Sequence, residues 1–166
     1  DTPLASMSNA GSLALRGYIS SHGATTNCTT HVGVCLDYAE NYPTNDATLE
    51  PGDIVALDEI KPVNVVKAVA GSPIIGIVST KPGILLTEGD VLIGDISFQE
   101  PGQVPVALAG RVPIKVSNEN GAISIGDLLT VSSSSPGVAM KATEPGRVLG
   151  MALEPFDNVA SDSAPG

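Results

Sequence analysis

The sequence predicts an all-β fold, a compact sandwich or barrel of short strands with an extended N-terminal arm. The chain has 166 residues, of which 42% are hydrophobic, so one domain with a real core is expected. It contains 18 glycines and 13 prolines, which would interrupt long helices too often for a helical bundle. From residue 53 onward, short β-branched runs alternate with turn residues, which is typical of short strands.

The chain divides into three expected segments: an N-terminal arm with a cysteine loop (1–34), a β-rich core domain (35–157) and a polar C-terminal tail (158–166). In the arm, apolar residues at Leu13, Leu15 and Ile19 predict a strand, and Tyr18 lies within the same run. We interpret this strand as an assembly arm that pairs outside its own domain.

Two cysteines, Cys28 and Cys35, lie at the end of the arm and enclose six residues with an internal glycine. This spacing can close as a small disulfide loop, or the two can be small buried thiols on neighbouring strands. His31 lies between them, but a zinc site would need a further ligand that the sequence does not supply nearby. Asn27 begins a short sequon for glycosylation.

The core domain contains ten short apolar runs that we expect to be strands. They cover residues 53–57, 63–69, 74–78, 84–86, 91–93, 104–108, 111–116, 128–131, 138–140 and 148–153. The pair Asn120-Gly121 is a strong signal for a hairpin turn. The segment 132–137 is expected to be a longer turn between two strands, because it is made of serine, proline and glycine.

A Gly-Asp pair followed by two aliphatic residues recurs at positions 52, 89 and 126, which are 37 residues apart. We interpret it as a common way to begin a strand. The glycine supplies the turn, the aspartate bonds the backbone of that turn, and the aliphatic residues enter the core. The alternative is that these aspartates bind a cation.

The charge balance indicates which partners the chain can have. Eight Lys and Arg stand against 18 Asp and Glu, for a formal net charge of −10, so we expect no nucleic-acid partner. No apolar run is long enough to span a bilayer, so we expect no membrane insertion. Charged residues make up only 16% of the chain, which suits an extracellular or cell- or virion-surface assembly of copies of the same chain.

Few residues in the chain have the chemistry of an active site. The chain has two histidines, His22 and His31, with no serine-hydrolase elbow and no phosphate-binding glycine loop. We therefore expect no catalytic residues from these patterns and no cofactor. One alternative is a Ca²⁺ site in the acidic stretch, because that ion accepts oxygen ligands in an irregular loop. The candidate ligands are Asp37, Glu40, Asp46 and Glu50. The other interpretation is a solvated acidic loop.

One string carries a family resemblance. Asp37-Tyr38-Ala39-Glu40 precedes Gly52-Asp53-Ile54-Val55, and matching motifs follow at 75–83, 104–113 and 126–129. The combination, over about residues 35 to 155, resembles the β-rich C-terminal domain of phage neck-appendage and tail-fibre proteins and of some bacterial surface proteins. In the phage members this domain is an intramolecular chaperone that helps a trimeric fibre to fold and then cuts itself off.

The resemblance implies a cut just before the aspartate of a Ser-Asp-Tyr-Ala-Glu element, with Asp37 and Glu40 serving the reaction. Leu36 stands where that serine would be, which removes hydroxyl assistance to acyl transfer, so we expect no enzyme activity. A structural alternative explains the same residues. Tyr38 would pack its ring while Asp37 and Glu40 bond backbone amides at the entrance to the first core strand.

These observations predict the structural subunit of a self-assembling extracellular fibre, filament or tube. Copies would be joined by exchange of the arm, because a donated strand gains main-chain hydrogen bonds along a sheet edge. The alternative function is the intramolecular chaperone and self-processing domain of a phage-type tail fibre.

Overall fold

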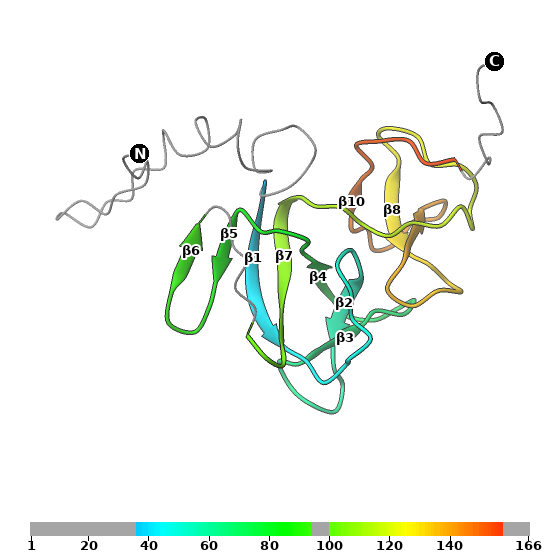
Figure 1. Ribbon diagram of the computed structural model, residues 1–166. Helices are drawn as coiled ribbons and strands as arrows, with labels where there is room; N and C mark the ends of the chain where they lie inside the picture. The colour runs from blue at the N-terminus through cyan, green and yellow to red at the C-terminus, as the bar shows by residue number, and fades with distance from the viewer. Residues whose placement is uncertain (1–35, 94–99, 158–166) are drawn as a thin grey trace, which may run out of the picture.

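The computed structural model describes residues 36–93 and 100–157, and these residues form an all-β fold without helices (Figure 1). The predicted fold class is therefore confirmed. The strands are β1 (Leu36–Pro43), β2 (Ile54–Leu57), β3 (Val65–Lys67), β4 (Ile74–Val78), β5 (Ile84–Leu86), β6 (Val91–Ile93), β7 (Gln103–Arg111), β8 (Leu128–Val131), β9 (Ala139–Lys141) and β10 (Gly150–Met151). The predicted arm, the cysteine loop, the sequon at Asn27 and the C-terminal tail lie outside the described residues.

The strands form two sheets. The larger sheet has seven strands in the order β3-β2-β4-β7-β1-β5-β6, and the smaller has three in the order β10-β8-β9. The larger sheet is open, since β3 and β6 lie at its two ends, so the barrel alternative is wrong and an open two-sheet arrangement holds. Neighbouring strands pair antiparallel except for β1 and β5, which are parallel.

The core lies on both faces of β2. Ile54 and Ala56 face a cluster that includes Leu129 and Val131 of the smaller sheet, so this cluster joins the two sheets. Val55 points the other way, into a second cluster with Val106 of β7. Burial on both faces explains why β2 is a continuous apolar run and does not alternate with polar residues.

Two of the three Gly-Asp pairs form the same turn. The carboxylates of Asp53 and Asp127 each accept a hydrogen bond from the backbone N–H three residues earlier, at 2.9 and 2.7 Å. Gly52 and Gly126 have positive φ angles of 87° and 91°, which glycine adopts without strain. At the third pair the direction of the hydrogen bond is reversed: the backbone N–H of Asp90 donates to the hydroxyl of Thr87, three residues earlier. The turn interpretation is confirmed at two of three positions, but the expectation that the aliphatic residues enter the core is wrong for Val91 and Leu128, which are 57% and 48% exposed.

Several elements differ from the predictions, and the expected strands at 63–69 and 148–153 are shortened to β3 and β10. Strand β1 was expected only as the entrance to a strand, yet it is central in the larger sheet, between β7 and β5. The expected strand at 111–116 is absent beyond Arg111, and Val116 makes only a single bridge to Ala139. Asn118–Gly121 forms a turn but not a hairpin, because its flanks bond other segments. The turn at 132–137 does connect two paired strands, β8 and β9.

Candidate functional site

The predicted residue Asp37 lies near the start of β1, beneath the connection from β4 to β5. Its side chain is 5% exposed, and its backbone carbonyl accepts a hydrogen bond from the Gly83 N–H at 3.1 Å. Neither Asp37 Oδ2 nor the buried Ser79 hydroxyl has a hydrogen-bond partner among the described residues. Burial raises the pKa of the Asp37 carboxyl, and the N–H groups of Asp37 and Gly83 act in the opposite direction.

Glu40 does not join Asp37. Side chains of a strand alternate between its faces, so residues three apart project to opposite sides. The burial pattern agrees, because Asp37 and Ala39 are buried while Tyr38 is 40% exposed and Glu40 is half-buried. Glu40 instead neighbours Tyr42, and burial together with this carboxylate raises the pKa of Tyr42. The structure therefore does not assemble the two carboxylates into one site, and the Tyr38 ring is only partly covered.

The other candidate calcium ligands also have separate partners. Asp46 accepts hydrogen bonds from the N–H and hydroxyl of Thr48, at 2.9 and 2.6 Å, which lower its pKa. Glu50 pairs with Lys115 Nζ at 2.7 Å, which lowers the pKa of Glu50. Among residues 36–93 and 100–157 no group of three or more His, Cys, Asp or Glu side chains is placed to hold a metal ion.

A buried charged group that the sequence only partly indicated is Asp53. Its carboxylate is 1% exposed and lies 3.3 Å from Lys67 Nζ and 2.7 Å from Lys115 Nζ. The turn interpretation identified its backbone bond but not these two lysines, which come from distant segments. The two ammonium groups balance the negative charge of the buried Asp53 carboxylate. These ion pairs link the start of β2 to β3 and to the segment after β7, so the role of Asp53 is structural.

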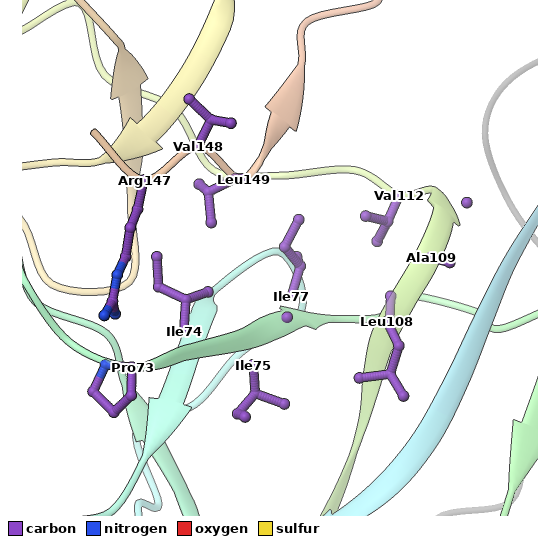
Figure 2. Close-up of a pocket in the computed structure, with 13 residues that line it drawn as sticks. Pro73, Ile74, Ile75, Ile77, Leu108, Ala109, Val112, Arg147, Val148 and Leu149 are labelled. Carbon is purple, nitrogen blue, oxygen red and sulfur yellow. The ribbon is translucent and has the colours of Figure 1, made fainter. Parts of the chain in front are cut away.

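The described residues form a groove where the larger sheet opens between β4 and β7. These two strands pair only at Ile77↔Ala107 and Val78↔Val106. Beyond this point they diverge, and Figure 2 shows β4 crossing the view while β7 runs down it. Residues 109–111 of β7 stay paired with β1 on their other side, whereas Leu108 is the extra residue of a bulge in that pairing, and all four residues are exposed. Within the described chain, no backbone hydrogen bond joins this β7 edge to any segment except β1.

The groove has a volume of about 520 Å³, and it is lined mostly by apolar residues together with polar atoms of the backbone and of Arg147. One wall is formed by β4 and the other by the end of β7, and a third side comes from the segment just before β10 (Figure 2). The side chains labelled in Figure 2 belong to Pro73, Ile74, Ile75, Ile77, Leu108, Ala109, Val112, Arg147, Val148 and Leu149. Arg147 is the one charged lining residue, and it donates a hydrogen bond to the Ser72 carbonyl at 3.0 Å.

Gly76 allows the two strands to meet at the base of the groove. A Cβ atom at this position would lie 2.2 Å from the carbonyl oxygen of Ala107 and 2.8 Å from Cγ1 of Val106. Such distances are far below van der Waals contact, so only glycine permits this approach. The β4 strand therefore touches β7 at one corner and then turns away, which leaves the β7 edge open.

Comparisons of the chain with protein-family models, with curated proteins and with solved structures gave no match. The resemblance to phage fibre domains therefore stays a prediction. The described part of the chain also contains no helix that is long and apolar enough to cross a membrane.

The groove was missed by sequence reasoning because it depends on how two strands diverge. Ile74-Ile75-Gly76-Ile77-Val78 correctly predicted β4, and the only local signal of the corner was its central glycine. This glycine does not identify the partner strand, and the exposure of four consecutive residues at the end of β7 is visible only in the structure.

Proposed function

We propose that this chain is the structural subunit of a self-assembling extracellular fibre, filament or tube, in which an extended segment of one copy joins the sheet of another. The observation that carries the proposal is the open edge of β7 at residues 108–111 beside the apolar groove. An unpaired strand edge is a template for pairing with another chain, and main-chain hydrogen bonds supply the affinity.

The groove supports this function in a second way. A strand edge that faced only solvent would gain nothing from a partner strand except backbone hydrogen bonds. Here the edge runs beside apolar side chains of β4 and of the segment before β10, so a docked strand also buries apolar side chains. Leu108, which lines the groove, is 40% exposed in the single chain.

The chaperone and self-processing alternative has less support in the geometry. It needs Asp37 and Glu40 to act together, whereas the two side chains project from opposite faces of β1. Glu40→Gln tests it in a longer precursor. Loss of cutting would favour the alternative, and unchanged processing would contradict it.

The proposed function is tested by measuring polymer formation with the full chain. We expect wild type to form regular filaments or tubes in electron micrographs and to sediment as large species. Leu108→Asp places a charge on the open edge and is expected to abolish most of the polymer. Ile60→Asp is the matched control, because Ile60 is 87% exposed on a loop outside the groove lining. Wild type that stays monomeric at all concentrations would overturn the proposal.

A further inference from the structure

We infer that the segment that occupies the β4–β7 groove is Leu13–Ile19 of a neighbouring copy, paired with the β7 edge at residues 108–111. This inference rests on the proposed function and adds the identity of both surfaces of the joint. The segment lies outside the described residues. Its sequence, the length of chain that follows it and the geometry of the groove support the inference.

The side-chain pattern of this segment fits the groove. In an extended chain every second residue shares a face. One face of the segment would carry only apolar residues and glycine, namely Leu13, Leu15, Gly17 and Ile19. The groove likewise offers apolar side chains beside the open edge and has no acidic residue in its lining. Residues 1–11, 20–30 and 158–166 show no comparable alternation of large apolar residues. A second alternating run, Val32, Val34 and Leu36, continues directly into β1 and is therefore not a separate segment that could be donated.

The size of the groove also fits. An apolar cavity of about 150 Å³ is large enough to hold a benzene molecule. At about 520 Å³, the groove has room for the leucines and the isoleucine of such a face. The four exposed residues at the end of β7 match the length of pairing that a short donated strand requires.

The connection is long enough to reach a second molecule. Sixteen residues separate Ile19 from Leu36, and an extended chain of that length spans at most about 55 Å. Strand β1 begins at Leu36 opposite Arg111, next to the end of the open edge. Strands joined within one sheet usually need only a few connecting residues. A connection of sixteen suits a step between copies, and a head-to-tail step that does not close produces a filament.

The test uses two full-length variants that each lack one surface of the joint. Leu13→Asp combined with Leu15→Asp disables the donor segment and leaves the groove intact. Leu108→Asp disables the groove edge and leaves the donor intact. We expect each variant alone to remain at 16.8 kDa in sedimentation velocity, with association weakened at least a hundredfold. A mixture of the two can form a single joint, so it should produce a complex of about twice that mass and nothing larger.

A matched control separates charge from position. Ser8→Asp combined with Ala10→Asp adds the same charge to the arm outside the proposed segment, and this variant should polymerise like wild type. Polymer formation by the Leu13/Leu15 double variant would overturn the inference and leave the proposed function standing. Wild type that does not polymerise would overturn both. If wild type is monomeric and its arm becomes protease-sensitive when Leu108→Asp is introduced, the arm fills the groove of its own molecule. That result would also overturn exchange between copies.

Discussion

Substitution of Gly76 by alanine is the sharpest test of the corner that opens the groove. The new Cβ would lie 2.2 Å from the Ala107 carbonyl oxygen and 2.8 Å from Val106 Cγ1. Neither atom can move easily, because the first belongs to the backbone of a central strand and Val106 is fully buried. The clash must therefore separate β4 from β7 at the only two residue pairs that join them.

The loss in the free energy of unfolding follows from the packing and the hydrogen bonds that this separation disturbs. Overpacking a well-packed site costs roughly 1–3 kcal/mol. Each weakened ladder hydrogen bond adds about 1 kcal/mol. We therefore expect Gly76→Ala to lower the free energy of unfolding by about 3 kcal/mol or more, which urea denaturation followed by circular dichroism would measure as a lower midpoint.

Gly89→Ala is the matched control for this experiment. Gly89 has open space around the position of a Cβ and no positive φ angle. Alanine there should leave stability unchanged or raise it by roughly 0.4–1 kcal/mol through the unfolded state. Equal urea midpoints for the two variants would show that the corner tolerates a side chain and that the contact of β4 with β7 does not require glycine at position 76.

Three further predictions concern buried polar groups. Asp53→Asn should lower the free energy of unfolding by about 3 kcal/mol in urea, because it leaves two lysines beside a buried neutral group. Asp127→Asn, at the more exposed equivalent turn, should lower the free energy of unfolding clearly less, and equal losses would contradict this. Burial raises the pKa of the Asp37 carboxyl in the folded chain. The contribution of this residue to the free energy of unfolding is therefore fully present below the unfolded pKa of about 3.9 and is lost as pH rises through the folded pKa. The melting temperature of Asp37→Asn should thus rise relative to that of wild type from acid to neutral pH. A difference in melting temperature that stays constant with pH would contradict this prediction. Ser132→Ala should cost about 1–2 kcal/mol, since the Ser132 Oγ accepts the N–H groups of the turn that follows β8, and an unchanged melting temperature would disprove that role.

The sequence predicted much of this fold because local signals agreed with the tertiary structure. The runs at 74–78, 84–86, 91–93 and 128–131 are strands with the predicted bounds. The Gly-Asp turns were also recognisable, since the carboxylate bonds a backbone group only three residues away. Short-range physics controls both features, so sequence patterns are sufficient to identify them.

Long-range features were not predictable in the same way. Strand β1 contains Asp37, Glu40 and Asn41, a polar composition that suits a loop, and its pairing with β7 and β5 overrides that local preference. The candidate carboxylates Asp37 and Glu40 were grouped by their closeness in sequence, but strand alternation separates them. The groove depends on where β4 leaves β7, and the lysines on Asp53 come from segments 14 and 62 residues further along the chain.

Amide hydrogen exchange at residues 108–111 shows whether the β7 edge joins the copies. These four backbone N–H groups lie on the strand proposed as the acceptor, so exchange would be compared in wild type below and above the concentration at which it polymerises. We expect slower exchange of the outward-facing amides in the polymer, and no slowing in the Leu13/Leu15 double variant at the same concentration. Equally fast exchange at this edge in monomer and polymer would show that copies join elsewhere and that β7 is not the acceptor.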